Sequence, residues 1–259
     1  PADPAHTLED VEVQRDALIL QYRCDGLCRL DVLPVGADAY QVQMPDAAYS
    51  LHVQSGEEYQ SPQVRLRYES LNRPAEIRAL NLKSGEQTVL KQTPVEGPFD
   101  AEAYRVERLW AIADDGARIP VSLIERSDAS GSGPLYLYGY GAYGASMDPW
   151  FSHARLSLLD RGWRFAIAHV RGGAEMGEYW YQQGKLEHKG NTFSDFIRCA
   201  EQLIEQGKTD PGHLVIAGGS AGGLLIGNVI NQRPELFRAA VADVPFVDVW
   251  NTMNNPELP

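Results

Sequence analysis

Residues 214–225 form the sequence feature that most constrains the fold. They consist of a short apolar run, a Gly-x-Ser-x-Gly motif centred on Ser220, and a second apolar run. Such a motif between a strand and a helix is typical of a sharp turn that exposes a serine hydroxyl. Gly218 and Gly222 leave room on both sides of this turn. The pattern predicts Ser220 as a candidate nucleophile, with the backbone N–H of Ala221 facing the oxyanion formed during attack.

A glycine-rich turn of a dinucleotide-binding fold is the alternative interpretation of this run. The phosphate-binding fingerprint requires G-x-G-x-x-G, and the glycines here are spaced differently. The chain has three cysteines, Cys24, Cys28 and Cys199. A zinc site needs a second Cys/His pair near the first, and none lies near Cys24 and Cys28 in the sequence. We therefore expect no cofactor and no metal.

The composition of the 259 residues is that of a globular protein that can bury a sizeable core. No apolar run approaches the roughly 18 residues of a membrane span, and residues 1–4 lack the pattern of a signal peptide. The cysteine usage favours a reduced, cytoplasmic setting. The 35 acidic and 23 basic residues argue against nucleic-acid binding and mildly favour cationic partners, although solubility alone also explains the acidity.

Residues 11–92 consist of short alternating segments that repeat at an offset of 47 residues. The matching segments are residues 17–22 with 64–68, and residues 40–43 with 87–90. Turn signals at Asp25-Gly26 and Asn72-Arg73-Pro74 occupy equivalent places. A β-rich period of this size is typical of propeller blades, which cannot bury both faces alone. A small meander or sandwich packed on the second half is the alternative.

The pattern changes after residues 93–100, which predict a connector. A hairpin over 104–125, turning at 114–116, is followed by alternating strands and helices. The expected strands are 134–138, 163–170, 213–218 and 237–243, and the expected helices are about 152–161, 193–206 and 221–231. Thr192 is expected to cap the helix from 193, with Asp195 three residues later.

Strands separated by helices indicate a parallel, doubly wound sheet, and the element order matches an α/β-hydrolase. We expect the C-terminal part of a β-propeller, about two blades, over residues 1–95 and an incomplete α/β-hydrolase domain over 96–259. In this fold the loop after the third strand, here residues 138–144, supplies the second oxyanion donor. The hydroxyl of Tyr140 is suited to this role. Aromatic-glycine loops are also common as plain packing, so the residues alone leave both interpretations open.

Several motifs resemble signatures of the prolyl oligopeptidase family of serine peptidases. They occupy residues 137–141, 171–177, 218–223 and 231–237, and those at 144–162 and 244–249 look most like the oligopeptidase B group of that family. The resemblance covers essentially the whole chain. It implies a propeller joined to an α/β-hydrolase domain, with Ser220 as nucleophile and the Ala221 N–H and Tyr140 hydroxyl as oxyanion donors. It also implies hydrolysis of short peptides after Arg or Lys through an acyl-enzyme.

A serine nucleophile needs a general base, and the triad of this fold runs Ser, Asp or Glu, then His. All six histidines precede Ser220. His213 opens the strand that ends at the serine, about 20 Å away along it. His169 should lie beyond an intervening strand and is expected to be a satisfied core histidine. We therefore expect the triad Asp and His to lie outside this chain, which resembles a truncated and, taken alone, inactive polypeptide.

Arg171 follows the fourth strand at the same rim of the sheet. It either orients a substrate carboxylate or pairs with Glu175, and an ion pair that holds the loop is the favoured interpretation. Three rival functions stay open: a proline-specific peptidase of the same family, a carboxylesterase sharing the serine turn, and a binding module or pseudoenzyme that keeps the fold.

Overall fold

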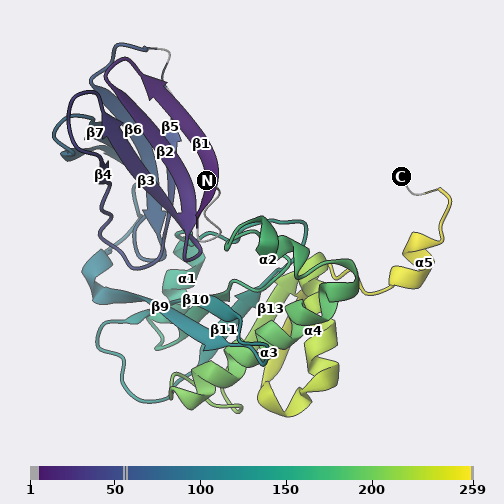
Figure 1. Cartoon of the computed structure of the whole chain (residues 1–259). Helices are drawn as coiled ribbons and strands as arrows, with labels where there is room; N and C mark the ends of the chain where they lie inside the picture. The colour runs from purple at the N-terminus through teal and green to yellow at the C-terminus, as the bar shows by residue number, and fades with distance from the viewer. Residues whose placement is uncertain (1–5, 55, 57, 258–259) are drawn as a thin grey trace.

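The computed structural model describes residues 6–54, 56 and 58–257. Its first third forms two four-stranded sheets, which Figure 1 shows standing above a six-stranded sheet. Neighbouring strands of both small sheets are antiparallel. Their strands are β1 (Thr7–Gln14), β2 (Ala17–Cys24), β3 (Leu27–Pro34) and β4 (Tyr40–Gln41), then β5 (Tyr49–Gln54), β6 (Gln63–Ser70), β7 (Glu76–Asn81) and β8 (Gln87–Gln92).

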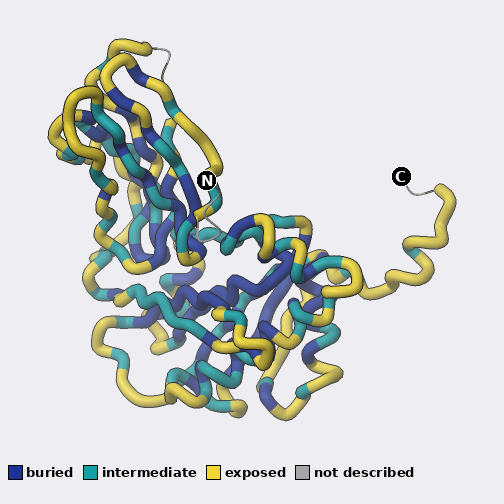
Figure 2. The backbone as a smooth tube through the Cα atoms, in the orientation of Figure 1, coloured by how far each residue is buried: buried dark blue, intermediate teal, exposed yellow. Residues whose placement is uncertain are grey.

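The repeat predicted from the sequence corresponds to equivalent strands of the two small sheets. β2 and β6 are the second strands of their sheets, and β4 and β8 are the fourth. The two sheets share one apolar core, to which Ile19, Leu30, Leu51 and Leu66 each contribute a fully buried side chain. Figure 2 shows buried residues along the strands of these sheets. Each sheet therefore buries one face against its neighbour, as propeller blades do.

The remainder of the described chain forms one mixed sheet with the strand order β14-β13-β11-β12-β10-β9. The pairs β9–β10 and β10–β12 are antiparallel, and β12, β11, β13 and β14 run parallel to one another. The strands are β9 (Tyr104–Ile112), β10 (Arg118–Arg126), β11 (Leu135–Gly139), β12 (Arg164–Ala168), β13 (Leu214–Gly219) and β14 (Ala239–Asp243). The helices are α1 (His153–Leu159), α2 (Glu178–Gln182), α3 (Lys189–Glu205), α4 (Ala221–Gln232) and α5 (Val249–Met253).

Helices cover both faces of this sheet, as a doubly wound fold requires. Leu123 and Ala166 face the larger apolar core, which includes side chains of α3 and α4. Their neighbours Ile124 and Phe165 face a second core with Leu159 of α1. The alternation follows from the two-residue period of a strand. The expected α/β-hydrolase architecture preceded by propeller blades is confirmed.

Two local predictions differ from the structure. The helix expected from residue 193 begins at Lys189, so Thr192 lies inside α3 and is not its N-cap. The hydroxyl of Thr192 instead donates to the carbonyls of Arg171 (2.7 Å) and Gly184 (3.2 Å). The short helices α2 and α5 were not expected. Among the described residues, none of the helices has both the length and the apolar character that crossing a membrane requires.

Candidate active site

Ser220 occupies the turn between β13 and α4, and its backbone adopts φ 54° and ψ −115°. A non-glycine residue rarely adopts a positive φ, and such strain is typical of functional sites. The side chain is exposed, whereas the following Ala221 is buried. The local sequence therefore projects the serine hydroxyl from the rim of the sheet.

The backbone of Ser220 is held by the neighbouring strand and by the loop after it. Its N–H donates to the carbonyl of Asp243 at the end of β14 (2.9 Å), and its carbonyl accepts from the N–H of Phe246 (3.0 Å) and of Gly223 (2.9 Å). These bonds over-determine the turn, which is how a strained conformation persists.

The absence of a side chain at Gly222 allows α4 to approach the end of β11. A Cβ atom at this position would lie 2.7 Å from the carbonyl oxygen of Gly139 and 3.3 Å from Cδ2 of Tyr140. The ring of Tyr140 therefore lies beside Gly222 in the first turn of α4, and Gly222 is only two residues after Ser220. The sequence therefore correctly predicts Gly222 as a position without room for a side chain.

The structure brings together the two predicted oxyanion donors at the carboxyl ends of β11 and β13. Ala221 is the first residue of α4, where backbone N–H groups have no partner within the helix. Tyr140 directly follows β11, and its ring centroid lies 6.5 Å from that of the exposed Tyr143. Both groups therefore lie on the same rim as Ser220.

A cavity of about 520 Å³ opens next to the serine turn. Its lining includes Ala221 and Phe246 from the serine side, and Tyr143, Tyr181 and Lys189 from the loops opposite. Burial lowers the pKa of Lys189 to about 8.

Neither nearby histidine is placed to act as base for Ser220. His169 follows β12, and β11 lies between β12 and the serine strand β13. Its Nε2 lies 2.8 Å from Ser122 Oγ, while its Nδ1 lies 3.7 Å from Glu175 Oε1, beyond hydrogen-bond distance. Burial lowers its pKa. His169 is thus a core histidine with only one ring nitrogen paired, and His213 is exposed and lies 2.9 Å from Asp210.

Arg171 forms the ion pair that the sequence favoured, but with different partners. Its guanidinium bonds Asp195 of α3 through Nε (2.8 Å) and NH2 (2.6 Å), and Asp115 of the β9–β10 turn through NH1 (2.5 Å). The proposed partner Glu175 instead accepts from the N–H of Met147 (2.8 Å). Arg171 therefore holds the 171–177 loop and does not face the cavity beside Ser220.

Sequence reasoning missed Lys189 and the role of Asp195. Asp195 was expected to assist a helix cap, yet it is fully buried against Arg171. The signal was available in part, because an acidic residue on the apolar face of α3 requires a buried partner. Among the described residues, no group of three or more His, Cys, Asp or Glu side chains is placed to hold a metal ion.

Comparisons with protein families cover most of the chain. Residues 1–93 match the "Prolyl oligopeptidase, N-terminal beta-propeller domain" and residues 149–259 match the "Prolyl oligopeptidase family". The chain is 42% identical to Protease 2 of Moraxella lacunata over 254 residues, which are 97% of this chain and 37% of that protein. The chain belongs to the prolyl oligopeptidase family.

Other members of the prolyl oligopeptidase family show where this chain falls within it. Dipeptidyl aminopeptidase BI of Pseudoxanthomonas mexicana is 43% identical over 93% of this chain and 34% of that protein. Oligopeptidase B from Trypanosoma brucei with covalently bound antipain superposes with a TM-score of 0.88 at 41% identity, over 100% of this chain and 38% of that one. Oligopeptidase B from Leishmania major superposes with a TM-score of 0.87 at 40% identity, over 99% of this chain and 38% of that one. The chain thus spans little more than a third of these relatives.

Proposed function

We propose that this chain carries the nucleophile and oxyanion hole of a serine oligopeptidase of the oligopeptidase B type. The observation that carries the proposal is the strained, exposed Ser220 at the start of α4, with Tyr140 beside the same helical turn. The blades ahead of the hydrolase sheet and the likeness to oligopeptidase B support the assignment.

In the proposed reaction Ser220 Oγ loses its proton to the base and attacks the scissile carbonyl, and the C–N bond then breaks. The amine product leaves with that proton, and water hydrolyses the acyl-enzyme to release the acid product and free Ser220. The Ala221 N–H and the Tyr140 hydroxyl donate to the oxyanion of the tetrahedral intermediate. The attack also requires a histidine base and its acid, and no histidine follows Ser220 within this chain. We therefore expect the 259 residues alone to be inactive and the longer protein to be active.

We further propose cleavage after Arg or Lys and a preference for short, cationic peptides. The support is that two structural neighbours at 40% and 41% identity are oligopeptidases B, whereas a structure of prolyl endopeptidases is 33% identical. The acidic composition agrees with cationic substrates. Chromogenic peptides ending in Arg, Lys or Pro, given to the full-length protein, test this preference. We expect kcat/KM to favour Arg and Lys over Pro by at least about 100-fold.

We also propose the domain division at residues 95/96 and a cytoplasmic setting. The division is supported by β8, which ends at Gln92, and by the hydrolase hairpin, which starts at Tyr104. The setting is supported by the buried thiols Cys28 and Cys199. Burial raises the pKa of the Cys28 thiol to about 12, which keeps it in the unreactive thiol form.

Labelling with a fluorophosphonate tests the nucleophile directly. We expect the full-length protein to be labelled at Ser220 and the Ser220→Ala variant to lose both the label and peptidase activity. Ser194→Ala is the matched control, because this exposed serine of α3 only bonds the carbonyl of Asn191 (3.1 Å). A wild-type protein that takes no label would favour a pseudoenzyme, and turnover of simple esters without peptide cleavage would favour a carboxylesterase.

A further inference from the structure

Three side chains in the first turns of α3, spaced three residues apart, form hydrogen bonds with the loops at the rim of the sheet. Lys189 Nζ donates to the carbonyl of Gly141, and Thr192 Oγ1 donates to the carbonyl of Arg171 (2.7 Å). Asp195 Oδ2 accepts from the backbone N–H of Arg171 (3.0 Å). Residues at this spacing share one face of a helix. One face of α3 therefore contacts both the 171–177 loop and the 139–145 loop. Of the three side chains, Lys189 is the one that donates a hydrogen bond to the 139–145 loop.

Gly141 directly follows Tyr140 and fixes how that residue leaves β11. Its φ is +66°, and a Cβ atom there would collide with Thr192 Cγ2 and lie 2.7 Å from Val170 Cγ2 and 3.2 Å from the carbonyl oxygen of Arg171. Glycine is the residue that adopts this conformation without strain, but it also permits rotations of the peptide that a side chain would forbid. The bond from Lys189 to the Gly141 carbonyl opposes that rotation, and a rotation would displace the Tyr140 ring.

The surroundings of Lys189 make this bond strong. Its Nζ lies 5.8 Å from the ring of Phe193, and the side chain lines the same cavity as Ala221 and Leu224. A half-buried ammonium beside apolar groups interacts more strongly with a carbonyl acceptor than an ammonium in bulk water does. The lowered pKa of Lys189 has the same origin in burial.

We infer that Lys189 is a positioning residue for the oxyanion hole, holding the Gly141 peptide so that the Tyr140 hydroxyl is aimed at the oxyanion. The inference rests on the proposed function, since it concerns the proposed role of Tyr140. It assigns Lys189 no contact with the substrate carbonyl. Its effect should therefore appear in the chemical step and pass through Tyr140.

Substitution of Lys189 in the full-length protein tests the kinetic side of the inference. We expect Lys189→Met to lower kcat by about 10- to 100-fold with little change in KM, because misplacing one oxyanion donor affects mainly the transition state. Lys189→Arg, which keeps a charged donor, should restore most of kcat. Lys83→Met removes an exposed lysine from the turn after β7 and should leave kcat unchanged. If Lys189→Met reduces folding, Lys189→Arg and Lys189→Gln carry the comparison.

A double-mutant cycle with Tyr140→Phe separates positioning from a general structural effect. We expect Lys189→Met to reduce kcat by less than about 2-fold when Tyr140 has already lost its hydroxyl. Independent, multiplicative losses would overturn the inference, and so would an unchanged kcat in Lys189→Met.

A readout without activity distinguishes failure of this inference from failure of the proposed function. With 3-fluorotyrosine at position 140, we expect its ¹⁹F resonance to shift or broaden in Lys189→Met and to return in Lys189→Arg. An unchanged resonance overturns the inference. A wild-type protein that neither cleaves peptides nor labels at Ser220, yet shows the resonance change, sinks the proposed function and supports the positioning contact.

Discussion

At the scale of single residues, Gly222 links the serine turn to the oxyanion loop. A Cβ here would lie 2.7 Å from the backbone oxygen of Gly139, so α4 or the end of β11 must shift. We expect Gly222→Ala to lower kcat/KM by about 100-fold, because a shift of about 1 Å misplaces Ser220 against Tyr140. The overpacking should also reduce the free energy of unfolding by about 1–3 kcal/mol. Peptidase kinetics and urea denaturation of the full-length protein measure the two effects.

Gly227 provides a control on the same helix. Its nearest contact for an added Cβ is Val247 Cγ1 at 3.5 Å, an ordinary van der Waals distance. Gly227→Ala should therefore keep full activity and gain up to about 1 kcal/mol of stability, since alanine favours the helix. Equal activity of Gly222→Ala and Gly227→Ala would contradict the tight approach of α4 to β11.

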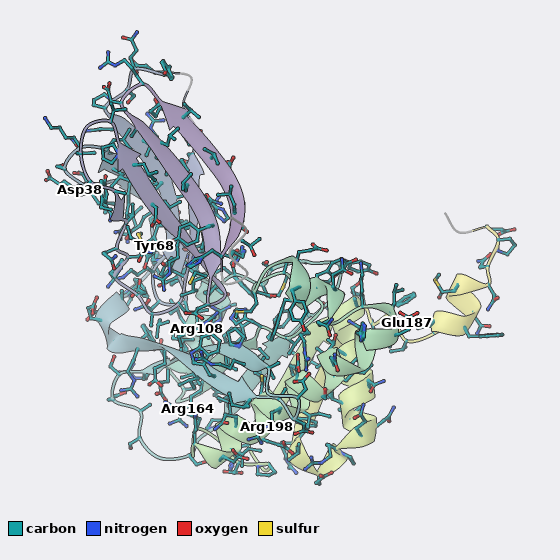
Figure 3. All side chains as sticks on the ribbon, viewed as in Figure 1. Asp38, Tyr68, Arg108, Arg164, Glu187 and Arg198 are labelled. Atoms are coloured by element: carbon teal, nitrogen blue, oxygen red, sulfur yellow. The ribbon has the colours of Figure 1, made fainter. Side chains whose placement is uncertain are left out.

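At the scale of elements, a buried carboxylate ties the antiparallel strands to the parallel part of the sheet. Glu125 of β10 bonds Arg164 of β12 (2.6 Å), Arg105 of β9 (2.5 Å) and Lys208 beyond α3 (2.9 Å). Figure 3 shows Arg164 at the level of the six-stranded sheet. Burial alone would raise the pKa of Glu125, but the hydrogen bonds from Arg164, Lys208 and Arg105 outweigh it and lower the pKa to about 2.

This depressed pKa predicts a pH dependence of stability. The ordinary pKa of this carboxyl is 4.5, so its contribution is fully present above pH 4.5 and is lost as the pH falls toward about 2. Removing one partner from a buried ion pair typically costs about 3–5 kcal/mol. We expect Glu125→Gln to lower the free energy of unfolding by about that amount at pH 7, and the difference from wild type to shrink below pH 4.5.

Urea denaturation of the full-length protein at pH 7 and at pH 3 measures this difference. The exposed Glu86, on the turn before β8, serves as control, because Glu86→Gln should change little at either pH. A Glu125→Gln deficit that stays constant between the two pH values would argue that lost packing, and not lost charge, destabilises the variant.

The elements that the sequence predicted well are those determined by local pattern. The 47-residue repeat, the 114–116 hairpin turn and the strand–serine–helix unit each depend on residues close together in the chain. The predicted start of α3 was wrong, because the hydroxyl of Thr192 donates to the carbonyl of Arg171, 21 residues earlier, and does not cap the helix. Lys189 and Asp195 were missed as partners of the rim loops for the same reason. Pairings across the fold leave no periodic signal in a single sequence.

At the scale of the whole molecule, the sheet of β1–β4 (the first blade) contacts the part of the chain that forms the six-stranded hydrolase sheet and its loops through polar groups. Arg23 at the end of β2 bonds both oxygens of Asp148, which follows the 139–145 loop (2.8 and 2.9 Å), and also Glu9 (2.6 Å). Arg108 of β9 donates to the carbonyl of Asp25 (3.0 Å), and Figure 3 shows Arg108 where the blades meet the large sheet. Arg23 is only 6% exposed, so its pairing with Asp148 is shielded from water.

The shielding predicts that Arg23 and Asp148 couple strongly. Removing Arg23 leaves Asp148 without its bidentate partner, and removing Asp148 leaves the buried Arg23 with Glu9 as its remaining carboxylate. We expect a coupling free energy of about 1–3 kcal/mol from a cycle of Arg23→Met and Asp148→Asn, measured by hydrogen exchange of β2 and β3 in the full-length protein. The same sheet holds a matched control in Arg15 and Asp16, which are paired at 2.7 Å but 53% and 58% exposed. Arg15→Met should change the opening free energy by less than about 1 kcal/mol, because water screens that pair. If both arginines gave the same small effect, the polar contact would not hold the blade against the hydrolase sheet, and apolar packing would have to do so.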